Sequence, residues 1–115
     1  MDGHDLAAEY YRTIDEDEYE TLESILVEEF VHDRPDMTLD GRDRFVSFMR
    51  DERPVSDTEH TIEAVYATDD GERVAAEGEL VRADGGVWFR FVDTFAFDDG
   101  RIATIRTYTD EHPSD

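Results

Sequence analysis

Apolar residues near the start of the chain recur at helical spacing. Leu6, Tyr10 and Ile14 follow one another every four residues, and mostly polar or small side chains separate them. This spacing predicts an amphipathic helix over residues 3–15 with one apolar stripe. Tyr10 lies on that stripe and is expected to face inward, where an aromatic side chain most often simply fills the core.

Two further helices are expected before the middle of the chain. A second apolar set extends through residues 19–30 and predicts a helix of similar length. Pro35 then interrupts the pattern, because proline lacks a backbone donor and disfavours helix in the residue before it, so residues 31–40 are expected to be loop or short strand. A third, short helix should begin at Gly41 and end near Arg53-Pro54. Its apolar face carries Phe45, Phe48 and Met49.

The second half of the chain changes to the alternating pattern of strands. Four strands are expected, at residues 60–67, 73–82, 87–97 and 102–109. Short Gly-bearing connections separate them, as in Asp98-Asp99-Gly100, which favours an antiparallel meander of hairpins. Helices followed by a meander predict an α+β fold in which an antiparallel sheet of four main strands packs on three N-terminal helices.

One face of the third strand places a carboxyl group among aromatic rings. The alternating residues on this face are Phe89, Phe91, Asp93, Phe95 and Phe97. If this face is the core, desolvation raises the pKa of Asp93 and favours its neutral form, which can donate a hydrogen bond. Such groups gather at functional sites, although an Asp paired with an Arg, with no chemical role, is an equally acceptable interpretation.

The opposite face of this strand is also largely apolar. It carries Trp88, Arg90, Val92, Thr94 and Ala96. A sheet that is apolar on both faces needs two covers, and a chain with few helices can obtain the second from another subunit. The sequence therefore predicts a homodimer formed through the sheet.

Composition bounds the class of protein. The chain has 115 residues, the usual size of one domain, so residues 1–115 are expected to form a single domain. It has 32 acidic and 11 basic side chains, for a net charge of -21, and all basic residues are Arg. A surface this acidic repels phosphate and anionic lipid, which argues against nucleic-acid and membrane partners.

The same composition indicates the setting. Acidic residues spread along the chain, together with the lack of Lys, are similar to the composition of cytoplasmic proteins of salt-loving archaea. Concentrated salt screens such charges, so low salt should destabilise the fold. No Cys is present, the first residues do not resemble a signal peptide, and no apolar run is long enough to span a membrane. A cytoplasmic protein is expected.

Motifs for cofactor or metal chemistry are missing from the sequence. The four His residues are scattered without metal-ligand spacing, and no phosphate-binding loop, dinucleotide fingerprint or serine-nucleophile motif occurs. We therefore expect no cofactor and no metal. His32, beside Asp33, is the one histidine that could line a pocket, although a surface loop position is the more common role.

Several segments are similar to one known family. Glu9-Tyr10-Tyr11-Arg12, Leu26 to Asp33, Gly41-Arg42-Asp43 and Asp93 to Ile102 resemble the SnoaL-like branch of the nuclear transport factor two-like superfamily. The likeness covers nearly the whole chain. It implies a cone-shaped curved sheet wrapped around helices, called a cystatin-like roll, with a deep apolar cavity. Relatives include ketosteroid isomerases, polyketide cyclases, epoxide hydrolases and proteins that only bind, so the fold alone does not define the activity.

The ketosteroid-isomerase pattern can be carried over to three residues. It implies Tyr10 as an oxyanion-binding tyrosine, Asp33 as the general base and Asp93 as a protonated oxyanion-binding acid. Asp33 fits only if a one-residue gap is allowed, and the neighbouring Arg34 would lower its pKa and weaken it as a base. Otherwise Asp33 is a turn or capping residue. Glu77-Gly78-Glu79 replaces the Asp-Arg-Asp arrangement of limonene-epoxide hydrolase, which disfavours epoxide hydrolysis.

Two functions stay open at this point. The first is cofactor-free proton abstraction next to a carbonyl, giving isomerisation or cyclisation of a small hydrophobic ketone. The second is a non-catalytic dimeric protein that binds a small apolar ligand. The side chains expected to line the pocket are Ile14, Phe30, His32, Phe45, Phe48, Met49, Phe89, Phe91, Phe95 and Tyr108.

Overall fold

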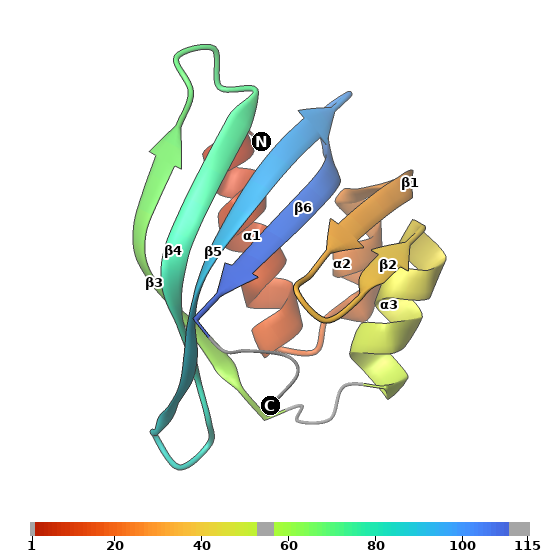
Figure 1. Ribbon diagram of the computed structural model, residues 1–115. Helices are drawn as coiled ribbons and strands as arrows, with labels where there is room; N and C mark the ends of the chain where they lie inside the picture. Colours follow the sequence, from red (N-terminus) through yellow and green to blue (C-terminus); the bar gives the residue numbers. More distant parts are fainter. Residues whose placement is uncertain (1, 53–56, 111–115) are drawn as a thin grey trace.

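A curved six-stranded sheet wraps around the first helix (Figure 1). The computed structural model describes residues 2–52 and 57–110. In spatial order the strands are β2-β1-β6-β5-β4-β3. The elements are α1 (Gly3–Asp15), α2 (Tyr19–Ser24), β1 (Leu26–Asp33), β2 (Thr38–Asp40), α3 (Arg42–Asp51), β3 (Glu59–Ala67), β4 (Arg73–Val81), β5 (Val87–Asp98) and β6 (Arg101–Thr109). The fold is α+β, as the sequence predicts.

Helix α1 has the predicted bounds. The Asp2 side chain caps its N-terminus by accepting a hydrogen bond of 2.8 Å from the backbone N–H of Asp5. The apolar stripe, including Leu6, Tyr10 and Ile14, is buried against β3, β4 and β5. None of the described helices is long and apolar enough to cross a membrane.

The predicted helix over residues 19–30 is wrong beyond its first turns. The chain is helical only to Ser24, and residues 26–33 form β1, which pairs parallel to β6 and antiparallel to β2. Leu22, Leu26 and Phe30 are four residues apart, a spacing that places side chains on one face of a helix and also on one face of a strand. Residues 26–33 form a strand because β6 and β2 pair with them on the two sides. The sheet consequently has six strands and is mixed, whereas four antiparallel strands were expected.

Residues 31–40, expected to be loop or short strand, contain the end of β1 and the short strand β2, and helix α3 begins where predicted. Gly41 adopts φ 101°, a conformation that favours glycine, and directs the chain from β2 into the helix. Phe45, Phe48 and Met49 are all buried. The expected helix end near Arg53-Pro54 lies outside the described residues.

The C-terminal meander is confirmed, and strands β3 to β6 are joined by antiparallel pairings. The β5–β6 turn has Asp99 at φ 52° and Gly100 at φ 75°, as a two-residue hairpin turn requires. The inner face of β5 is buried at Phe91, Asp93 and Phe95. On the outer face, Arg90 is exposed and Val92 is half-buried. The dimer through this face stays a prediction.

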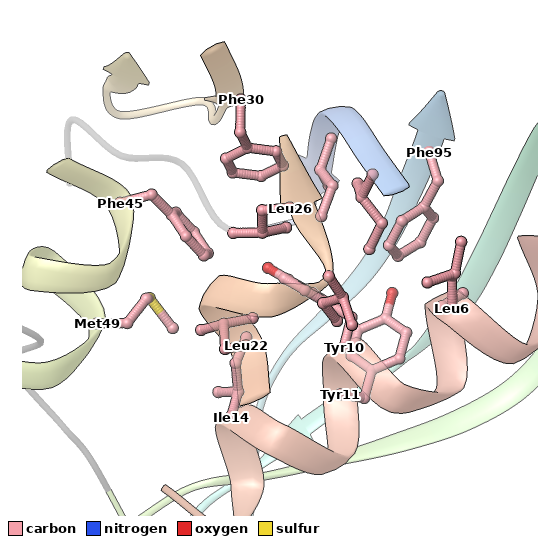
Figure 2. Packing of buried hydrophobic residues seen from close by; sticks show 14 of the residues in the cluster. Leu6, Tyr10, Tyr11, Ile14, Leu22, Leu26, Phe30, Phe45, Met49 and Phe95 are labelled. Carbon is pink, nitrogen blue, oxygen red and sulfur yellow. The ribbon is translucent and has the colours of Figure 1, made fainter. Parts of the chain in front are cut away.

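The core lies between the sheet and the helices. Figure 2 shows Tyr10 and Tyr11 of α1 packed among Leu22, Leu26, Phe45 and Phe95. Phe30 and Phe45 meet edge to face with ring centroids 4.9 Å apart.

Candidate functional site

A cavity of about 270 Å³ opens beside the core. Its walls come from α1, β1 and the turn after it, α3, and the inner face of β3 to β6. The lining residues are Tyr10, Ile14, His32, Arg34, Pro35, Asp36, Phe48, Met49, Thr58, His60, Leu80, Trp88, Phe89, Phe91, Asp93, Thr107 and Thr109. Most of the wall is apolar, and a few polar groups converge on it, as is usual for a ligand site.

Asp93 is held in place from two sides. The Tyr11 hydroxyl donates a hydrogen bond of 2.7 Å to Asp93 Oδ2, and the Thr107 hydroxyl donates one of 2.5 Å to Asp93 Oδ1. Asp93 is only 5% exposed. Tyr11 reaches it from α1 and Thr107 from the neighbouring strand, so three elements position one carboxyl group.

Burial dominates the electrostatics of this acid. Desolvation raises the pKa of Asp93, although the hydrogen bonds from Thr107 and Tyr11 act in the opposite direction. Desolvation and the proximity of Asp93 also raise the pKa of Tyr11 above its ordinary value. Tyr11 therefore stays protonated and remains a donor. The sequence-based expectation of an acid in apolar surroundings agrees with this geometry.

His32 extends the hydrogen-bonded chain. Its Nε2 lies 2.7 Å from Thr107 Oγ1, and its Nδ1 is buried without a hydrogen-bond partner among the described residues. A buried N–H without an acceptor is rarer than an unsatisfied acceptor, so the proton belongs on Nε2. Nε2–H then donates to Thr107, and Thr107 donates to Asp93. Burial, with the nearby Arg34, lowers the pKa of His32 to about 3, which keeps the ring neutral.

Asp33 does not line the cavity. Side chains alternate along a strand, so β1 directs His32 inward and Asp33 outward. The Asp33 carboxylate lies 3.4 Å from Arg106 Nε and accepts a 3.3 Å hydrogen bond from Thr38. Its side chain is 43% exposed. Asp33 thus lies on a strand and not in the expected turn, and its carboxylate is not part of the described cavity wall.

The other expected site residues divide into two groups. Tyr10 lines the cavity, but the tyrosine that contacts Asp93 is its neighbour Tyr11. The expected lining residues found in the cavity wall are Ile14, His32, Phe48, Met49, Phe89 and Phe91. Phe30, Phe45 and Phe95 are buried in the core instead, and Tyr108 points outward with 51% exposure.

Three functional residues were missed by sequence reasoning. Tyr11 is adjacent to Tyr10, and helical spacing does not separate two neighbours that are both buried. Thr107 becomes a candidate only through the β5–β6 register, which places it opposite Asp93. His60 contacts Asp15, 45 residues earlier, and no local pattern reveals that pairing.

The described side chains do not form a metal site of three or more His, Asp or Glu residues. Arg34 is the one cationic side chain in the described cavity wall, and it forms hydrogen bonds of 3.0 and 3.3 Å with Asp36. The Arg34 guanidinium also lies 5.3 Å from the centroid of the Phe48 ring. Its charge is thus largely satisfied within the protein.

A curved sheet around helices, with a buried acid in an apolar cavity, defines a class of small α+β cavity proteins. The chain belongs to the SnoaL-like domain family, which matches residues 7–105. No curated protein matches the sequence.

Solved structures show the same fold. A candidate ketosteroid isomerase from Kribbella flavida superposes with a TM-score of 0.83 at 22% identity, covering 95% of this chain and 78% of that one. A candidate polyketide cyclase from Pseudomonas putida gives 0.76 at 22% identity, with coverages of 94% and 91%. An epoxide hydrolase of Mycobacterium tuberculosis, similar to limonene-epoxide hydrolase, gives 0.80 at 22% identity, with coverages of 94% and 82%. At these identities the likeness concerns the fold.

Proposed function

We propose that the protein binds a small, uncharged carbonyl compound in the cavity and promotes its enolisation, with the neutral Asp93 carboxyl donating a hydrogen bond to the carbonyl oxygen. The observation that carries this proposal is the buried, doubly held Asp93 in the cavity wall. Isomerisation and cyclisation of ketones both pass through such an enolate. This chemistry needs no cofactor.

The direction of the hydrogen bonds supports the donor role. Both Asp93 oxygens accept hydrogen bonds, one from Tyr11 and one from Thr107. When Asp93 is neutral and both hydroxyls donate to it, its own proton is available to a ligand oxygen. A donor fixed in an apolar, water-poor site stabilises developing negative charge far better than water does.

The cavity also limits the ligand. A volume of about 270 Å³ lies slightly below the range of about 300–1,000 Å³ typical of drug-sized ligands, which favours a compound of one or two rings. An anionic ligand would meet a protein of net charge -21, and the Arg in the wall is already paired with Asp36. A neutral, mainly apolar ketone fits both conditions.

Exchange of α-protons in deuterated buffer tests this proposal. The probe is 2-tetralone, a two-ring ketone, and proton NMR follows the loss of its α-proton signal. We expect the wild-type protein to accelerate exchange above the buffer rate. Asp93→Asn keeps the shape but offers a weaker donor, so exchange should fall by about 10²-fold, the usual effect of losing one oxyanion donor.

Asp33→Asn is the matched control, since it makes the same Asp-to-Asn replacement at a residue outside the cavity. Exchange should be unchanged in this variant. Wild-type exchange that survives Asp93→Asn, or that is lost in Asp33→Asn, would contradict the proposed role of Asp93.

A second candidate function is ligand binding without turnover, and the position of Asp33 favours it. The base expected from the family resemblance is turned away from the cavity and paired with Arg106. A pure binding protein would show chemical-shift changes in cavity residues when 2-tetralone is added, but no exchange above the buffer rate. A single sample of the wild-type protein with 2-tetralone therefore distinguishes binding with exchange from binding alone.

A further inference from the structure

A second polar pair reaches the cavity from the start of β3. His60 Nδ1 lies 2.7 Å from Asp15 Oδ1, and the His60 backbone N–H donates a 3.0 Å hydrogen bond to Asp15 Oδ2. The two side chains are 15% and 18% exposed. One carboxylate thus holds both the backbone and the ring of the same histidine, which fixes the ring orientation.

The position of Asp15 is unfavourable for its own helix. Asp15 is the last residue of α1, where the partial negative charge of the helix end opposes an acidic side chain. Both its carboxylate oxygens face His60. A residue that breaks a local rule and has a specific distant partner often marks a functional site.

The hydrogen bond to Asp15 selects the tautomer of His60. A carboxylate accepts but does not donate, so in the neutral ring Nδ1 carries the proton and Nε2 keeps its lone pair. The two ring nitrogens point in widely different directions. Asp15 lies in an acidic surface hollow outside the cavity, whereas His60 lines the cavity, so Nε2 is directed inward. Among the described residues no side chain or backbone group bonds to Nε2.

His60 and Asp93 both contact the same aromatic residue, Tyr11. The Tyr11 ring centroid is 5.0 Å from that of His60, and the Tyr11 hydroxyl bonds Asp93. The Phe91 ring also lies against His60, with 5.6 Å between centroids. A molecule in the cavity can therefore contact the imidazole and the carboxyl group together.

The other polar groups in the described cavity wall do not supply a base. Asp36 is bonded to Arg34, and His32 donates from Nε2 to Thr107. Asp93 is the proton donor of the proposed function. Since Asp33 faces away, the basic nitrogens of the described lining without a protein partner are His60 Nε2 and His32 Nδ1. Burial lowers the pKa of His32 to about 3, so its ring is a poor proton acceptor and His60 Nε2 is the better base.

We propose that His60 is a catalytic base of this cavity and that Asp15 is its positioning residue. This inference rests on the proposed enolisation and names its missing proton acceptor. The α-C–H bond of the ketone breaks, and its proton forms an N–H bond with Nε2. The electron pair of the broken bond becomes the enolate, whose oxygen Asp93 binds. The resulting imidazolium faces the Asp15 carboxylate, and the proton returns to carbon when the product forms.

The tautomer of His60 tests the geometry without any ligand. Nitrogen-15 NMR of the imidazole ring should show the proton on Nδ1 in the wild-type protein. In Asp15→Asn the amide NH₂ can donate to Nδ1, so the proton should move to Nε2. Glu16→Gln, which removes a neighbouring exposed charge that does not contact His60, should keep the wild-type tautomer. A wild-type proton on Nε2 would overturn the proposal.

Exchange of 2-tetralone α-protons tests the catalytic role. His60→Gln and Asp15→Asn should each reduce exchange by about 10²–10⁴-fold, the range of general-base catalysis, while Glu16→Gln should leave it unchanged. Exchange that is lost in Asp93→Asn but intact in His60→Gln overturns this inference and leaves the proposed function standing. No exchange by the wild-type protein overturns the proposed function and the base role with it. The tautomer of His60 is measured on the wild-type protein, so this test of the His60–Asp15 geometry holds even if a variant fails to fold.

Discussion

Single hydrogen bonds decide the chemistry available to the buried polar groups. Thr107 links His32 to Asp93, so the proton on His32 sets the direction in which the Thr107 hydroxyl donates. With Nε2–H as donor, every hydrogen bond in the chain points toward Asp93. Both carboxyl oxygens of Asp93 thus accept a hydrogen bond, and under the proposed function the proton of the neutral acid is left for a ligand.

The buried His32 makes the fold sensitive to acid. Its pKa is about 3 in the folded protein and about 6.5 when unfolded, so acid protonates the unfolded state first. A group that stays neutral when folded contributes stability above pH 6.5, and this contribution is lost as pH falls toward 3. Between pH 7 and 4.5 the loss is about 2–3 kcal/mol. His32→Gln should remove that part of the pH dependence.

Urea unfolding at several pH values measures the effect. The raised pKa of Asp93 acts in the opposite direction, because its contribution to stability is present at low pH and declines as pH rises above its unfolded value. Asp93 is present in both proteins, so the difference between wild type and His32→Gln isolates the histidine. Equal pH dependence in the two proteins would show that His32 is not kept neutral by burial.

At the scale of elements, one bulge sets the partner of Asp93. The β5–β6 pairing starts with Asp98 opposite Arg101, and an unbroken register from there would place Asp93 opposite Arg106. The register shifts by one residue between Ala96 and Phe97, so Thr107 faces Asp93 instead. Without the bulge the acid would face a guanidinium and form the ion pair that the sequence left open. The bulge directs Arg106 outward to Asp33.

Gly78 allows β4 to approach the bulged strand β3. A Cβ at this position would lie 2.1 Å from the Thr61 carbonyl oxygen, closer than any real contact. Because backbone must move to relieve this clash, Gly78→Ala should reduce the free energy of unfolding by about 1–3 kcal/mol, as overpacking does. Urea denaturation checks the value.

Gly86→Ala is the control for that substitution. Its added Cβ would meet only the flexible Asp84 side chain, at 3.1 Å, so its stability should change little. Equal stability of Gly78→Ala and Gly86→Ala would show that the close β3–β4 approach is not a constraint.

At the scale of the whole molecule, charge controls stability. A net charge of -21 on 115 residues favours expansion when ions are scarce. The Debye length shortens from about 10 Å at 0.1 M salt to about 3 Å at 1 M, so repulsion between distant carboxylates fades. The thermal unfolding midpoint should therefore rise by more than about 5 °C between 0.1 and 1 M KCl, a stabilisation of roughly 1 kcal/mol.

Circular dichroism at matched pH follows that midpoint. Screening predicts that most of the rise occurs at the lower concentrations, and NaCl should act like KCl. A midpoint that is flat or falls with salt would mean that local ion pairs, such as Arg12 with Glu18, offset the repulsion.

Hydrophobic periodicity was enough to predict most elements and the burial of Asp93, because it reports directly which face of a helix or strand is buried. It predicted α1, the start of α3 and the four-stranded meander. It could not distinguish strand from helix at β1, where a four-residue spacing fits both. That difference turned Asp33 outward and His32 inward.

The polar groups that meet in the site are brought together by the packing of the elements. Tyr11 reaches Asp93 through helix packing and Thr107 through the strand register, and Asp15 holds His60 across 45 residues of sequence. These pairings depend on distances between elements far apart along the chain. Local patterns in a sequence carry no information about such distances, so the composition of the site follows from the fold.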